Sequence, residues 1–231
     1  MYTPRHRMSP GIILAAATVV ALVVMVVRLS LRGRRAKELQ RAAAARGMSF
    51  EACGQPFGEA EMEQILRFTR RRGHRCHFVA RGNVNGEEVI FFEHLARNGG
   101  RESVAAFRLA APDFELIRLR HAVNPAVMAP VFSRLGFAVV NFEGDANFSR
   151  EYLLIGRDEG ALRHLFNDTL RSFYCVPQGE RHWASEAGAG WLLVFRADRM
   201  IRPGDLGKFL DEAALVATAV RREVNNVAAV G

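Results

Sequence analysis

The sequence is poor in cysteine and lacks the motifs of well-known catalytic centres. Its 231 residues include three cysteines, Cys53, Cys76 and Cys175, which lie far apart and form no Cys-x-x-Cys pair. This count favours a reducing cytosol over a disulfide scaffold, with the thiols acting as small apolar side chains. No Gly-x-Ser-x-Gly elbow, Walker A loop or His-Glu-x-x-His pair occurs. We therefore expect no cofactor and favour a non-catalytic function.

The sequence also lacks an excess of charge in its main part. The net charge is +8, but residues 1–37 carry seven basic and no acidic residues. The remaining residues carry 25 basic and 24 acidic side chains. A nucleic-acid-binding domain is basic in its own right. The near-neutral domain therefore argues against nucleic acid as a partner.

One long apolar run is present at residues 11–27, where Thr18 is the only polar side chain. Arg28 can extend its guanidinium to the interface, so the run continues to Leu31 and spans 21 residues. A bilayer core of about 30 Å needs ~20 apolar residues. The pattern predicts a disordered tail at 1–10 and a transmembrane helix at 11–31.

Three other interpretations of this run are weaker. A cleaved signal peptide ends in a small-residue cleavage site, whereas arginines follow this run directly. A core helix of a soluble protein is disfavoured because no amphipathic pattern interrupts the run, and an interfacial helix needs a polar face, which residues 11–27 lack.

Basic residues are unequal on the two sides of the run. Arg5, Arg7 and the α-amino group precede it, and five cations follow within ten residues. Positive-inside bias places the C-terminal domain in the cytoplasm, as a single-pass protein of the bacterial inner membrane. We expect the five cations to determine topology and to contact lipid headgroups. They are Arg28, Arg32, Arg34, Arg35 and Lys37.

The segment after the run is rich in alanine and basic residues, which favour helix. It predicts a basic stalk helix over 32–47, with a break at Gly33 and Gly47 as the C-cap. Residues 48–222 are long enough for one domain with a core, and 223–231 form a C-terminal tail that frays.

Alternating apolar residues and turn signals predict the strands. Asn85-Gly86 is typical of a type I′ turn and joins strands at 76–84 and 87–94. Strands at 102–109 and 114–120 follow short turns and complete a four-stranded antiparallel meander. Further strands are predicted at 137–142, 152–155, 176–183 and 191–196.

Helical spacing of apolar residues predicts amphipathic helices at 59–70, 124–135, 158–173 and 203–222. Because runs of strands are followed by helices, without strict alternation, the fold class is α+β.

Two groups of polar residues are weak metal-site candidates. His74, Cys76 and His77 include zinc-binding types, but no second pair supplies the four ligands that zinc needs. The acidic turn at 143–147 has Leu154 where an EF-hand requires its twelfth-position glutamate. Both are interpreted as ordinary strand and turn residues, and we expect no metal.

Glu93, His94 and His121 contain the groups of an acid/base set, although nothing in the sequence brings them together. A basic cluster is a candidate anion-binding site, either for lipid headgroups or, less favoured, for RNA. The favoured alternative is a solvated helix end whose charge is offset by Glu59, Glu61 and Glu63. The cluster consists of Arg67, Arg70, Arg71, Arg72 and Arg75.

Several segments follow one another in a recognisable order. After the span and basic helix come residues 46–50, the hairpin at 82–92, and the motifs at 139–143 and 147–152. With the helix at 158–166 and the strand at 191–195, this order resembles a family of bacterial membrane-anchored proteins whose function is unknown. It implies the topology and fold only, and gives no residue a catalytic role.

These observations favour a membrane-anchored binding or assembly module that faces the cytoplasm. Its expected partners are the lipid bilayer and another membrane or cytoplasmic protein. Two alternatives remain open: a membrane-surface module that binds anionic lipid headgroups, and a membrane-tethered hydrolase without a recognisable motif.

Overall fold

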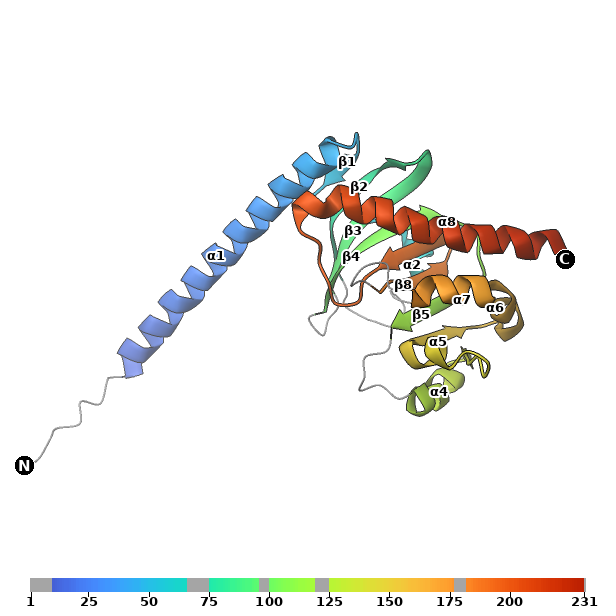
Figure 1. Cartoon of the computed structure of the whole chain (residues 1–231). Coiled ribbons are helices and arrows are strands. Elements are labelled where there is room, and N and C mark those ends of the chain that lie inside the picture. The colour runs from blue at the N-terminus through green and yellow to red at the C-terminus, as the bar shows by residue number, and fades with distance from the viewer. Residues whose placement is uncertain (1–9, 66–74, 96–99, 119–124, 177–181, 231) are drawn as a thin grey trace, which may run out of the picture.

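The fold is α+β, as the sequence predicts, and is built on one antiparallel sheet. The computed structural model describes residues 10–65, 75–95, 100–118, 125–176 and 182–230. Figure 1 shows a long N-terminal helix that projects from the domain and a second long helix, at the C-terminus, that crosses the sheet.

The described chain contributes nine strands to the sheet, in the order β1-β2-β3-β4-β9-β8-β5-β7-β6. Every neighbouring pair is antiparallel. The strands are β1 (Ser49–Glu51), β2 (Arg75–Val84), β3 (Glu87–Leu95), β4 (Arg101–Arg108), β5 (Phe114–Arg118), β6 (Ala138–Val140), β7 (Tyr152–Gly156), β8 (Ala184–Gly188) and β9 (Trp191–Phe195).

Helices lie on both faces of the sheet and at its ends. They are α1 (Pro10–Ala44), α2 (Glu59–Gln64), α4 (Pro125–Arg134), α5 (Ala146–Glu151), α6 (Glu159–Leu165), α7 (Asp168–Cys175) and α8 (Leu206–Val230), with the 3-10 turn η1 (Pro203–Asp205) directly before α8.

The meander is confirmed for three of its four strands. Asn85 and Gly86 have φ values of 54° and 83°, as a type I′ turn requires, and β2, β3 and β4 pair in order. The predicted fourth neighbour is wrong, because the β8–β9 hairpin lies between β4 and β5. Strand β9 is apolar at all five positions and buried on both faces, so a central place suits it better than an edge.

Several predicted elements have different bounds, and the helix predicted at 59–70 ends at Gln64, because Ile65 has an extended backbone. The helix at 158–173 is two helices, because the Asn167 side chain accepts a hydrogen bond from the Leu170 amide and begins α7 anew. The strand at 176–183 is wrong at its start, since Val176 caps α7 and the strand, β8, begins at Ala184. The C-terminal helix does not stop at Arg222 but continues to Val230.

The two faces of the sheet carry separate cores. One contains Phe91, Phe107 and Leu154 and packs against α8 and the α5–α7 helices. The other contains Phe92 and Leu193 and is covered by the segment that includes α2, with a smaller cluster beneath α4.

Helix α1 is continuous, so the predicted break at Gly33 is wrong. Its C-terminal part buries Leu39 and Ala43 against the first core. The helix ends at Ala44, and the turn that closes it contains Gly47, whose φ of 68° fits the predicted C-cap. The part before Arg32 extends away from the domain (Figure 1). Within the described residues, no helix meets the length and hydrophobicity needed to span a membrane.

Gly156 tests the close packing of β7 against its surroundings. A Cβ placed there would lie 2.6 Å from the Asp113 carbonyl oxygen and 2.5 Å from Leu162 Cδ1. We expect Gly156→Ala to lower the free energy of unfolding by ~1–3 kcal/mol, as overpacked sites do, in urea titrations of the full chain in detergent. Gly144→Ala, where no atom lies within 4 Å of the added carbon, is the control and should change it by less than ~0.5 kcal/mol. Equal effects of the two variants would contradict the packing at β7.

Candidate functional site

Two arginines one helical turn apart form the polar part of the junction between α1 and the sheet. Arg32 and Arg35 lie on the same helix face because of their i, i+3 spacing. They contact His77 on β2 and Glu93 on β3, which are direct cross-strand partners. The spacing of the two arginines along α1 therefore fits the spacing of His77 and Glu93 across the two strands. Together the two contacts set the direction in which α1 leaves the domain.

Arg35 and Glu93 form the more buried of these contacts. Arg35 Nε donates to Glu93 Oε1 at 2.9 Å, and Arg35 Nη2 donates to the Ile201 carbonyl at 2.8 Å. The Glu93 side chain is 6% exposed. Burial raises the pKa of Glu93 above its usual value, although the Arg35 guanidinium acts in the opposite direction. The desolvation of the carboxylate thus outweighs its ion pair.

Arg32 forms the outer contact. Its Nη2 lies 3.1 Å from His77 Nδ1, and its guanidinium lies 5.9 Å from the centre of the Phe78 ring. Burial, and then the charges of Arg32 and Arg75, lower the pKa of His77. A neutral imidazole can accept the hydrogen bond from Arg32. Phe78 has a φ of 54°, at a β-bulge that turns its side chain toward the helix.

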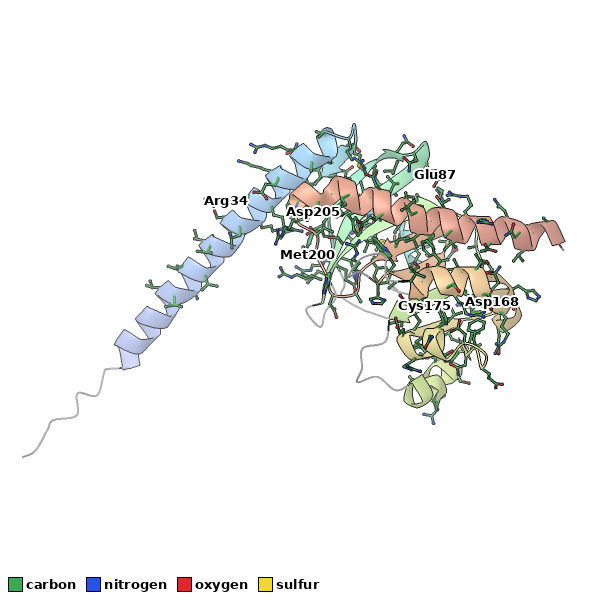
Figure 2. The ribbon with its side chains drawn as sticks, in the orientation of Figure 1. Arg34, Glu87, Asp168, Cys175, Met200 and Asp205 are labelled. Atoms are coloured by element: carbon green, nitrogen blue, oxygen red, sulfur yellow. The ribbon has the colours of Figure 1, made fainter. Side chains whose placement is uncertain are left out.

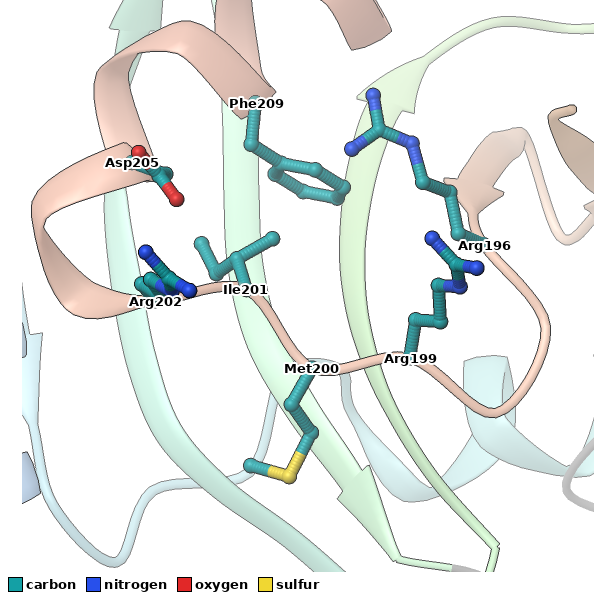
Figure 3. Close-up of a pocket in the computed structure, with 7 residues that line it drawn as sticks. All are labelled: Arg196, Arg199, Met200, Ile201, Arg202, Asp205 and Phe209. Atoms are coloured by element: carbon teal, nitrogen blue, oxygen red, sulfur yellow. The ribbon is translucent and has the colours of Figure 1, made fainter. Parts of the chain in front are cut away.

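A hollow of about 470 Å³ adjoins this junction, a size typical of small-molecule sites. It is formed by the segment between β9 and α8, and Arg35 bonds to that segment at Ile201. Figure 2 shows Met200 and Asp205 on the side where α1 leaves the domain. The lining residues, drawn in Figure 3, are Arg196, Arg199, Met200, Ile201, Arg202, Asp205 and Phe209.

The three arginines of the hollow differ in their burial and in whether their guanidinium groups have partners. Arg196 is buried, pairs with Glu212 of α8, and stacks on Trp183 with its Cζ 4.1 Å from the ring centre. Arg199 and Arg202 are exposed, and neither guanidinium has an ion pair or hydrogen bond within the described chain. The hollow is therefore lined by two cations without partners among the described residues, Arg199 and Arg202, and by the apolar side chains of Ile201 and Phe209.

The structure places the predicted cations in different environments. Arg32 and Arg35 turn to the domain, whereas Arg34 and Lys37 are exposed. Arg75 is exposed at the start of β2. The side chains of Arg28, Arg67, Arg70, Arg71 and Arg72 lie outside the described residues. Their assigned roles in topology and anion binding remain predictions.

The structure does not bring the predicted acid/base residues together. Glu93 and His94 are consecutive in β3 and point to opposite faces of the sheet, and His121 and His74 lie outside the described residues. Cys76 and His77 likewise face opposite sides. No group of three potential metal ligands gathers among the described residues.

Three side chains with potentially reactive groups lie in a row across the sheet face that carries the core of Phe92 and Leu193. Cys76, His94 and Glu102 are successive cross-strand partners on β2, β3 and β4, and His94 Nδ1 lies 3.8 Å from Glu102 Oε2. Their exposed fractions are 7%, 1% and 6%. A thiol nucleophile must meet its substrate. The burial of this row favours a structural role.

Sequence reasoning missed the arginines of the hollow. Their only signal is the spacing of three arginines within the short segment 196–202, between a strand and a helix begun by Pro203. Because turns are commonly polar, this signal does not distinguish a site from a solvated loop.

The class defined by this geometry is an α+β domain of one antiparallel sheet attached to a projecting N-terminal helix. No protein-family model matches the chain, and no curated protein matches it. A matching solved structure is the crystal structure of the mycobacterial trehalose monomycolate transport factor A, TtfA, with a TM-score of 0.53 and 14% identity. The match covers 83% of this chain and 93% of that chain, and it shows likeness of fold.

Removing Arg35 tests the buried ion pair. We expect Arg35→Met to lower the free energy of unfolding by roughly 2–3 kcal/mol, because a buried carboxylate loses its partner. Adding Glu93→Leu should restore much of the loss. Urea titration of the full chain in detergent measures both, and Arg34→Met, at an exposed position, is the control. A double variant no more stable than Arg35→Met would contradict the coupling.

The raised pKa of Glu93 predicts a pH dependence with a definite sign. The folded state holds the proton to a higher pH than the unfolded state, so it binds more protons between 4.5 and the raised value. The free energy of unfolding of the wild type, minus that of Glu93→Gln, should fall as pH rises through this window. Thermal unfolding of both proteins across a pH series measures it, and a difference that rises with pH would contradict the buried carboxylate.

Proposed function

We propose that residues 11–31 of the chain span the bacterial inner membrane and hold the domain at its cytoplasmic surface. There the domain acts as a non-catalytic binding or assembly module in a process that involves lipid. The observation that carries the proposal is that the surroundings of the α1 side chains change at Arg32. Beyond it the helix packs on the domain, and before it the described apolar side chains face outward.

The exposed part of α1 is costly in water. Val20, Met25 and Val26 are 61%, 52% and 61% exposed, although their spacing places them on different sides of one helix. Each side chain of this kind gains ~1.5–3 kcal/mol when it moves from water to an apolar medium. The structure describes side chains at 13 of the 21 positions in the run. Two observations therefore support the proposed span: the 21-residue length of the apolar run, and the backbone of α1, which is helical from Pro10.

The orientation and the lipid involvement have separate support. Orientation rests on the five cations that follow the run, against Arg5, Arg7 and the amino terminus before it. The lipid involvement is supported by the fold likeness to a trehalose monomycolate transport factor, since trehalose monomycolate is a glycolipid. The partner that we expect besides the bilayer is a membrane or cytoplasmic protein.

Cell fractionation tests the anchor. We expect the full chain to stay in the membrane pellet after alkaline carbonate and to dissolve only in detergent, because the apolar run lies in hydrocarbon. A variant without residues 11–31 should leave the pellet. The same experiment with protease added outside intact spheroplasts should leave the domain undigested. Full-length protein in the soluble fraction, or digestion of the domain from outside, would contradict the proposal.

A further inference from the structure

The hollow beside α1 lies where the proposed span ends. Arg35 follows Leu31 by four residues, about 6 Å along a helix, and its guanidinium bonds to the Ile201 carbonyl. The segment at 199–202 is thereby held next to the last turn of the apolar run. If the span stands in the bilayer, this segment meets the headgroup layer.

The charges of the hollow suit a phosphate group. Arg199 and Arg202 lie on opposite sides of the hollow in Figure 3, with Ile201 and Phe209 between them. Arg196 is already paired with Glu212, and among the described lining residues Asp205 is the only one with a carboxylate. Guanidinium groups bind phosphate oxygens with two parallel hydrogen bonds, so the two uncommitted arginines give the hollow the donors that a phosphodiester requires.

The apolar residues distinguish a lipid from a free anion. Met200 and Ile201 are half-buried and lie between the two arginines in the chain, and the buried Phe209 also lines the hollow. A soluble phosphate has no apolar part for these side chains to contact. A phospholipid has glycerol and acyl carbons next to its phosphate, and the end of α1 faces the same layer.

We propose that this hollow binds the phosphodiester headgroup of an anionic phospholipid, with Arg199 and Arg202 as the phosphate ligands. The inference rests on the proposed membrane anchor and identifies a ligand class for the domain's site. It assigns lipid contact to a segment separate from the stalk cations and from the cluster at 67–75. The bound headgroup would fix the domain against the bilayer at a second point, beside α1.

Native mass spectrometry of the full chain in detergent tests this site. The protein is incubated with equimolar phosphatidylglycerol and phosphatidylcholine, and the adducts of each lipid are counted. We expect the wild type to prefer phosphatidylglycerol. Arg199→Gln with Arg202→Gln should weaken phosphatidylglycerol binding at least about tenfold, because two charge-assisted hydrogen-bonding groups are lost.

The matched control is Arg150→Gln with Arg222→Gln, which removes the same charge from two exposed positions on α5 and α8. This control should keep the preference of the wild type. Equal loss in both double variants would show that net charge alone attracts the lipid and would overturn the site. Retained preference in Arg199→Gln/Arg202→Gln would also overturn it, provided urea titration shows the folded state intact.

Three further outcomes distinguish a lipid ligand from a free anion, and the headgroup site from the membrane anchor. Inorganic phosphate that displaces phosphatidylglycerol completely and binds equally well without lipid would identify a free-anion site and contradict a lipid ligand. Protein that proves soluble in cells, yet shows Arg199- and Arg202-dependent phosphatidylglycerol adducts, would refute the anchor and support the headgroup site. Membrane-embedded protein without that dependence would refute the site alone.

Discussion

The buried ion pair between Arg35 and Glu93 is the constraint on which the arrangement of helix and domain depends. A carboxylate that is 6% exposed on a central strand needs a partner, and the partner here comes from α1. The same guanidinium binds the Ile201 carbonyl, so one side chain connects the helix, the sheet and the segment before α8. Loss of this contact would free α1 to change direction at the point where its environment changes.

Other features of the junction follow from that contact. The i, i+3 spacing of Arg32 and Arg35 matches the cross-strand pairing of His77 and Glu93, so the helix can approach the sheet in one register only. The β-bulge at Phe78, with its positive φ, provides the aromatic surface beneath Arg32. Before Arg32 the described apolar side chains of α1 face away from the domain, where their exposure to water is costly.

Local patterns in the sequence predicted the parts of the structure that local chemistry determines. Asn85-Gly86 gave the hairpin turn, Gly47 gave the helix C-cap, and alternation gave most strands. The place of the β8–β9 hairpin between β4 and β5 was missed, because strand order depends on pairing between distant segments. Arg35 was interpreted as a membrane-surface cation, since its partner Glu93 lies 58 residues away. The arginines of the hollow were missed because the hollow forms only when the fold brings the polar loop at 196–202 next to Phe209 of α8.

The central claim is that α1 is one rod, with one part in hydrocarbon and the other on the domain. Spin labels at Val23 and at Glu38, introduced one at a time in a variant without native cysteines and reconstituted in liposomes, test it directly. Relaxation by oxygen and by a water-soluble nickel complex reports the surroundings of each label. We predict that the Val23 label is accessible to oxygen and shielded from nickel, and that the Glu38 label is accessible to nickel. Equal nickel accessibility at both positions would contradict the account.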